Sequence, residues 1–238
     1  MAMKSNISLL FPFLFLPLVI SAQAVPGSTG YEMTEMNSMN PNPQLLRTKS
    51  AIAYGTTGTP YVFEDFKQGN IFYANKMRID GKLLNYDCYN DRWEYSADNS
   101  IYLLNSNQID YFEIISGQNS TMLFKQVFVE KLKKQVSLQV LYNENSILYK
   151  RHFREFREAD YGGAYSQDRR YNEYHDRESY YLKTGDNELQ MLRSNKKSAL
   201  EIMEDQREEV EKYIKKEKPN LKTEAGLVQL IRFYDSLE

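Results

Sequence analysis

The stretch LLNYDCYNDRWEY, residues 83–95, contains the only cysteine and the only tryptophan of the 238-residue chain. Its first half alternates with a period of two, which places Leu84, Tyr86 and Cys88 on one side of an extended chain. The polar residues between them fall on the other side. Asn90-Asp91 is typical of a turn, and the alternation resumes directly after it. The stretch therefore predicts two antiparallel β-strands joined by a short turn.

The same stretch also offers groups for a binding site at the predicted turn. Carboxylates, a guanidinium and aromatic rings gather there, and exposed aromatic rings can stack on sugars or anchor a partner. The residues that could form this site are Asp87, Tyr89, Asp91, Arg92 and Trp93. Because Cys88 has no second cysteine in the chain to pair with, we expect it to be a small buried apolar residue; a reactive thiol or an intermolecular disulfide is the alternative.

Strand-like segments continue on both sides of this stretch. Asp80-Gly81, between two apolar runs, is a strong hairpin pattern, and turn residues recur about every 8–12 positions after it. We therefore expect an α+β protein whose β-rich domain, residues 55–193, is a mainly antiparallel meander forming a sandwich or a small barrel-like sheet. The further segments with strand character are 70–74, 77–79, 100–104, 109–114, 121–130, 136–142, 147–153, 178–183 and 188–192.

Residues 157–179 interrupt this rhythm. The segment is charged, rich in tyrosine and contains Gly162-Gly163, so it predicts a long exposed loop between strands. Its tyrosines fit a core less easily than those in the alternating segments. They are the favoured surface for a protein partner: Tyr161, Tyr165, Tyr171 and Tyr174.

The apolar pattern becomes helical in residues 194–238, where we expect two or three helices. Ser198 has the spacing of a capping box with Glu201, and Thr223 can cap the last helix. That helix carries an apolar stripe with spacings i, i+3, i+4 and i+7, which either packs on the protein's own sheet or preceding helix, or binds a partner. The stripe consists of Leu227, Leu230, Ile231 and Tyr234.

The N-terminus has the three parts of a secretory signal peptide over residues 1–24. Lys4 precedes an apolar run, and small residues follow it, with cleavage expected after Ala22 or Ala24. Residues 25–54 are rich in Pro, Gly, Ser and Asn and predict a flexible linker. We expect no transmembrane segment after cleavage, because no later apolar stretch is long enough to cross a bilayer as a helix.

Composition argues against several kinds of partner and chemistry. Removing the predicted signal leaves 29 Lys and Arg against 32 Asp and Glu, and this nearly neutral balance gives no electrostatic case for nucleic acid. Two separate histidines and one cysteine form no zinc-ligand pattern, and no nucleophile or phosphate-binding motif is present. We therefore expect no metal, no cofactor and no catalytic residues, although distant carboxylates leave a hydrolase open.

Several blocks resemble an uncharacterised family of exported proteins of Bacteroidota-type bacteria. The resemblance covers residues 55–238 and is carried by GTPYVFEDFKQGNIFY, SIYLLNSNQIDYFEI, the basic-acidic helical tail and an N-Y-D-x-Y-N-D block within residues 83–95. The resemblance implies a location in the cell envelope, and it implies no activity. No functional residue can be carried over from it.

These observations favour an exported protein of the cell envelope, either periplasmic or associated with the outer membrane or cell surface. Its expected role is a non-enzymatic binding or interaction module whose partner is another envelope protein. Two alternatives remain open: a β domain that binds a glycan or small ligand, and a hydrolase that depends on carboxylates. The oligomeric state is not indicated by the sequence.

Overall fold

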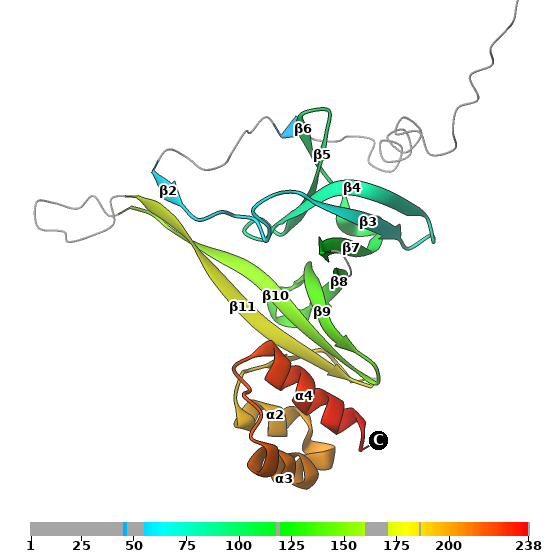
Figure 1. Cartoon of the computed structure of the whole chain (residues 1–238), viewed down its shortest axis with the longest axis vertical. Helices are drawn as coiled ribbons and strands as arrows, with labels where there is room; N and C mark the ends of the chain where they lie inside the picture. The colour runs from blue at the N-terminus through cyan, green and yellow to red at the C-terminus, as the bar shows by residue number, and fades with distance from the viewer. Residues whose placement is uncertain (1–44, 47–54, 118–119, 160–170, 186, 238) are drawn as a thin grey trace, which may run out of the picture.

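The computed structural model describes residues 45–46, 55–117, 120–159, 171–185 and 187–237, and it consists of one sheet and three helices (Figure 1). The strands are β1 (Leu45–Leu46), β2 (Thr56–Thr57), β3 (Lys67–Tyr73), β4 (Arg78–Asp87), β5 (Arg92–Ala97), β6 (Ser100–Leu103), β7 (Ile109–Gly117), β8 (Ser120–Val129), β9 (Lys134–Asn143), β10 (Ser146–Arg157), β11 (Asn172–Thr184) and β12 (Gln190–Leu192). The helices are α2 (Lys196–Ile202), α3 (Arg207–Glu217) and α4 (Glu224–Asp235), and three single 3-10 turns complete the elements: Ser106–Gln108, Glu130–Leu132 and Glu204–Gln206.

The sheet is a single open sheet with the order β1-β6-β5-β4-β3-β7-β8-β9-β10-β11-β12, and β2 also pairs with β11. All neighbours are antiparallel except β2 and β11, so the sheet is mixed. Its curvature brings strands together that are far apart in this order: Trp93 on β5 donates a hydrogen bond from Nε1 to Ser137 Oγ on β9 at 2.7 Å. The expected α+β class and antiparallel meander are confirmed.

Strands β4 and β5 form the hairpin that the opening stretch predicts. Tyr86 lies opposite Trp93, and Asp91 in the connecting turn has a positive φ of 59°. The polar residues Asn85 and Asp87 of β4 are buried as well, and residues 59–63 lie along the end of this strand, where Tyr61 forms an antiparallel bridge with Asp87. Asn85 binds the backbone of Phe63 twice, through Oδ1 at 3.3 Å and Nδ2 at 3.0 Å. We call residues 59–63 the strap.

The long hairpin of β10 and β11 corrects the boundary of the predicted loop. Arg157 and residues 172–179 belong to strands, and the two strands pair without a break from Arg157–Glu173 to Ser146–Thr184. Opposite charges, rather than apolar alternation, face each other across this hairpin, as in Arg177 and Glu155 at 2.9 Å. A charged strand of this kind has the composition of a loop, which is why the sequence predicted one.

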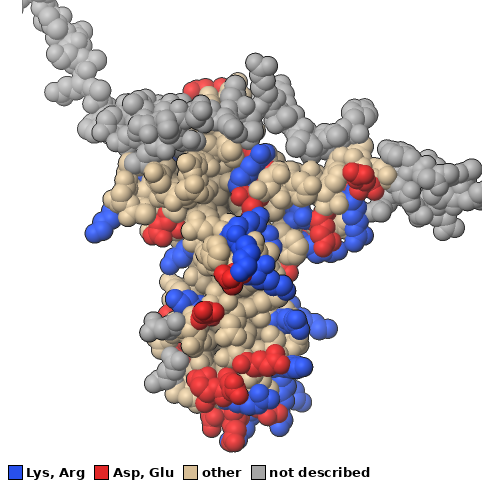
Figure 2. Space-filling model, turned by 180° about the vertical axis from the view of Figure 1, so that it is seen from behind, with Lys and Arg blue, Asp and Glu red and all other residues tan. Residues whose placement is uncertain are grey.

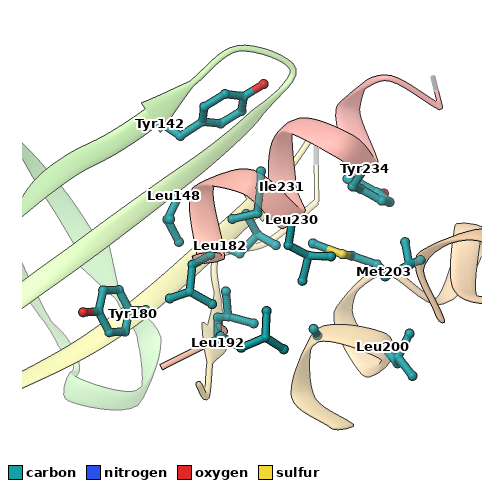
Figure 3. Close-up of a cluster of buried hydrophobic side chains, with 14 residues drawn as sticks. Tyr142, Leu148, Tyr180, Leu182, Leu192, Leu200, Met203, Leu230, Ile231 and Tyr234 are labelled. Carbon is teal, nitrogen blue, oxygen red and sulfur yellow. The ribbon is translucent and has the colours of Figure 1, made fainter. Parts of the chain in front are cut away.

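The three helices pack at the lower end of the β10–β11 hairpin (Figure 1). Leu148 and Leu182 from the sheet meet α2 and α4 in a shared apolar core (Figure 3). The stripe of α4 is buried there, so it packs on the protein itself, and Thr223 caps α4 by accepting from the Gly226 N–H. The α2 cap is Asn195 and not Ser198, because Asn195 accepts the Ser198 N–H at 2.9 Å.

The helices are also joined to the sheet by charge. The Lys150 side chain is buried on β10, and its ammonium lies 2.7 Å from Glu224 at the start of α4 and 2.5 Å from Glu178 on β11. A buried ammonium requires such partners, since an unpaired charge inside a protein is costly. This arrangement fixes the position of the first turn of α4 on the sheet.

The N-terminal predictions are only partly within the described residues. The proposed signal peptide, residues 1–24, lies outside them. Within the predicted linker 25–54, Leu45 and Leu46 form β1 and pair with β6. Among the described residues no helix has the length and apolar character needed to cross a membrane.

Candidate protein-binding surface

The turn after β4 lies against the upper part of the β10–β11 hairpin. The Tyr89 ring is 5.4 Å from the Tyr174 ring and 6.1 Å from Phe156, and the Phe156 and Tyr174 rings are 4.9 Å apart. Tyr89 is 45% exposed, whereas the other two are half-buried. We call these three residues the aromatic cluster. The cluster brings together Tyr89, from the predicted site at the turn, and Tyr174, from the predicted tyrosine-rich loop, which the sequence indicated as two separate binding surfaces.

Of the other tyrosines predicted for this surface, one is described. Tyr171 precedes β11 and is exposed. Tyr161 and Tyr165 lie outside the described residues. Phe156 was not predicted from the sequence, although it is an aromatic residue between charged ones just after the predicted strand 147–153, which is a usable signal.

The strap holds the aromatic cluster in place. The N–H groups of Cys88 and Tyr89 both donate to the Pro60 carbonyl, at 3.0 and 3.3 Å. On the other side, Arg154 of β10 donates to the carbonyls of Thr59 at 3.1 Å and Tyr61 at 2.7 Å. Hydrogen bonds to the backbone carbonyls of the strap therefore connect it to the turn on one side and to β10 on the other. Rings held in this way lose little conformational entropy when a partner binds.

Asp91 has a structural role beside the aromatic cluster. It accepts a hydrogen bond from the Tyr86 hydroxyl and lies 2.6 Å from the Lys134 ammonium and 3.5 Å from Arg151. Burial, and then the Asp91 charge, raises the pKa of Tyr86 well above its usual value. These contacts join the β4–β5 turn to β9 and β10, so Asp91 is occupied by the protein's own groups.

Asp87 and Glu94 form a second buried polar group around Arg92. The Arg92 Nε lies 3.0 Å from a carboxylate oxygen of each. Tyr61 of the strap donates to Glu94 at 2.8 Å, and Asn90 donates to Asp87 at 2.7 Å. Burial raises the pKa of Glu94 above its usual value. Two neighbouring carboxylates could serve a hydrolase, but these two hold the strap and the turn.

Trp93 lies in the core and not on the surface. It is 0% exposed and is stacked between Phe112, with ring centres 4.1 Å apart, and Tyr86, at 5.1 Å. A sugar ring has no access to a side chain in this position. Of the five residues that the sequence placed at the turn, only Tyr89 presents its side chain as an exposed surface group.

Cys88 is buried, as expected. Its Sγ lies 3.2 Å from the Pro60 carbonyl oxygen, and burial raises its pKa to about 12. The thiol is therefore protonated at neutral pH, and a protonated thiol is a poor nucleophile.

His152 is a partly buried group whose titration should be visible in stability measurements. Its Nε2 lies 2.7 Å from Gln139 Oε1, and burial, followed by the Lys150 charge, lowers its pKa to about 4 from 6.5. Between these values the unfolded chain binds a proton that the folded protein does not, so stability falls as the pH falls. The expected loss is about 3 kcal/mol over this window.

A His152→Gln variant isolates this effect, because glutamine keeps a polar group near Gln139 and does not titrate. We expect the unfolding free energy of wild type minus that of the variant to fall by about 3 kcal/mol between pH 7 and pH 4. Urea titrations at several pH values measure it. A difference that stays constant with pH would show that the folded protein protonates His152 as easily as the unfolded chain.

Among the described residues, no group of three or more His, Cys, Asp or Glu side chains is placed to hold a metal ion. The face in Figure 2 carries basic and acidic side chains side by side, including those on the helices at its lower end.

No family model matches the chain, and neither a curated protein nor a solved structure does.

Proposed function

We propose that this chain is an exported, non-enzymatic module of the cell envelope that binds another protein through the aromatic cluster. The observation that carries the proposal is the meeting of Tyr89, Phe156 and Tyr174 on one surface, with Tyr89 nearly half exposed. Tyrosine is enriched in the centres of protein interfaces because it provides a large contact area with few rotatable bonds and a polar end.

The geometry of the rings favours a protein partner over a glycan. Tyr89 meets Tyr174 at an interplanar angle of 75° and Phe156 at 57°. A sugar stacks on a flat aromatic face, whereas rings tilted against one another form an uneven surface into which side chains of a partner can pack. Trp93, one of the aromatic residues that a glycan could have stacked on, is buried.

The cell-envelope part of the proposal rests on the N-terminus and on the resemblance. Residues 1–24 have the composition of a signal peptide, and the blocks in residues 55–238 resemble exported proteins. A single free, buried cysteine is compatible with an oxidising compartment, since it requires no reduced environment to stay unpaired.

The proposal predicts that loss of two rings removes a partner. The tagged protein, cross-linked in its native cells and purified, should retain one dominant protein. A Tyr89→Ser, Tyr174→Ser double variant should recover it at least about tenfold less, because central aromatic residues each contribute about 2 kcal/mol or more to binding. Quantitative mass spectrometry of the purified material measures the ratio.

Phe128→Ser is the matched control. Phe128 lies on β8, is not one of the three residues of the aromatic cluster, and is 51% exposed. It should recover the partner as wild type does, and circular dichroism should show all three proteins folded. Equal recovery by the double variant, or no protein above background with wild type, would contradict the proposed function.

A further inference from the structure

The outer edge of β11 is paired at its two ends and open between them. Parallel β2 lies beside Asn172 and Glu173 at one end, and β12 pairs with residues 180–182 at the other. Within the described part of the chain, no strand pairs with residues 174–179 on this edge. Figure 1 shows β2 at the far end of the long hairpin. The unpaired part spans about 20 Å along the strand.

The regular pairing of β10 with β11 determines which backbone N–H and C=O groups of β11 point to its outer edge, away from β10. The Asn172 N–H donates to Gly55 at 2.8 Å, so it points away from β10. Directions alternate along a strand, and no bulge interrupts this one, so the N–H and C=O groups of Asp176 and Glu178 point to the same edge. Tyr174 is covered, because a Cβ on Gly58 would lie 2.7 Å from its carbonyl oxygen.

The charges on this edge oppose pairing with a second copy of the chain. Each of Asp176, Arg177 and Glu178 forms an ion pair with a side chain of β10, yet all three side chains keep a large exposed fraction, 78% for Asp176, and can still meet the charges of an added strand. A two-fold symmetric dimer through this edge would be antiparallel. It would place acidic side chains opposite acidic ones and Arg177 opposite its own copy, and like charges in such positions are destabilising. Edge strands commonly carry charges for this reason.

We propose that this edge binds an extended peptide segment of another protein as an added strand. The segment would place a basic, an acidic and a basic side chain opposite Asp176, Arg177 and Glu178. Its backbone would pair with the two N–H and two C=O groups of Asp176 and Glu178, of which the Asp176 carbonyl has only a long contact of 3.5 Å with Arg177. This surface goes beyond the aromatic cluster and does not depend on it.

The test uses two synthetic peptides and the purified mature protein. Acetyl-Val-Lys-Glu-Lys-Val-amide has the matched charges in either strand direction, and acetyl-Val-Glu-Lys-Glu-Val-amide has them reversed. In amide NMR titrations, the matched peptide should shift the Asp176 and Glu178 signals and slow their hydrogen exchange. The reversed peptide should bind at least about fivefold more weakly, because its like charges face the edge.

Two variants separate the backbone from the charge. Asp176→Pro removes an N–H that points to the open edge, where proline is tolerated, and should abolish binding of the matched peptide. Asp176→Asn keeps the N–H and should retain binding within about threefold. Tyr89→Ser should bind the peptide as wild type does. Loss of partner binding by the aromatic cluster can therefore be distinguished from loss of peptide binding at the edge of β11.

Four results would overturn the proposal. These are equal binding of both peptides, no binding, binding by Asp176→Pro equal to that by Asp176→Asn, or Asp176 and Glu178 amides already protected in the free protein. In the last case, light scattering of wild type and Asp176→Pro would show whether a second copy or the protein's own chain covers the edge.

Discussion

Replacement of Trp93 with alanine is expected to lower the free energy of unfolding by about 3–5 kcal/mol. The indole is fully buried, lies between Phe112 and Tyr86, and meets Phe124 edge-on with ring centres 5.3 Å apart. Its removal leaves a cavity in the centre of the curved sheet. It also removes the hydrogen bond that joins β5 to Ser137 on β9.

Urea unfolding followed by circular dichroism measures this loss, since the variant has no tryptophan fluorescence. Trp93→Phe is the control: it retains most of the ring contacts and loses the hydrogen bond, so it should cost about 1–2 kcal/mol. A loss below about 1 kcal/mol for Trp93→Ala would place the indole outside the core. Trp93 would then again be a candidate for stacking on a sugar ring.

Arg92→Met is expected to cost about 2–3 kcal/mol at pH 7. The change leaves the carboxylates of Asp87 and Glu94 buried without the cation that lies 3.0 Å from each. Removing one partner of a fully buried ion pair costs more than this, but the Arg92 side chain is 35% exposed and solvent screens part of its charge.

The cost of Arg92→Met should shrink as the pH falls from 7 to 5. Burial already raises the pKa of Glu94, and loss of the guanidinium raises it further. When the pKa of a carboxyl is higher in the folded protein than in the unfolded chain, its charged form destabilises the fold at a pH above the folded pKa. This destabilisation disappears as the pH falls and the carboxyl takes up a proton. Urea titrations at both pH values, with Arg92→Lys as a charge-keeping control, check this. A cost that is the same at both values would contradict it.

Local patterns in the sequence predicted much of the fold. Period-two alternation identified β4 and β5, and the Asn90-Asp91 turn lies between them. The stripe of α4 and its Thr223 cap follow from helical spacing alone. The start of β11 was missed, because its stability comes from charges on β10 that no local pattern of residues 172–179 reveals.

The site was harder to predict, because it depends on contacts between distant segments. Tyr89 and Tyr174 were both named from the sequence, yet nothing in either stretch says that they meet. Trp93 and Tyr89 are equally plausible as exposed aromatics from composition, and only the curvature of the sheet places one inside and the other outside. The strap could not be foreseen either, since Tyr61 reaches Glu94 across 33 positions.

The most direct measurement of the central claim is site-specific photo-cross-linking in the native cells. A photoreactive phenylalanine derivative at position 89 should give a discrete adduct with one protein, and the same derivative at position 128 should not. Adding Tyr174→Ser should weaken the adduct at position 89 at least about fivefold, since the partner loses a neighbouring ring. Adducts of equal strength at positions 89 and 128, or none at position 89, would contradict the aromatic cluster as a partner-binding surface.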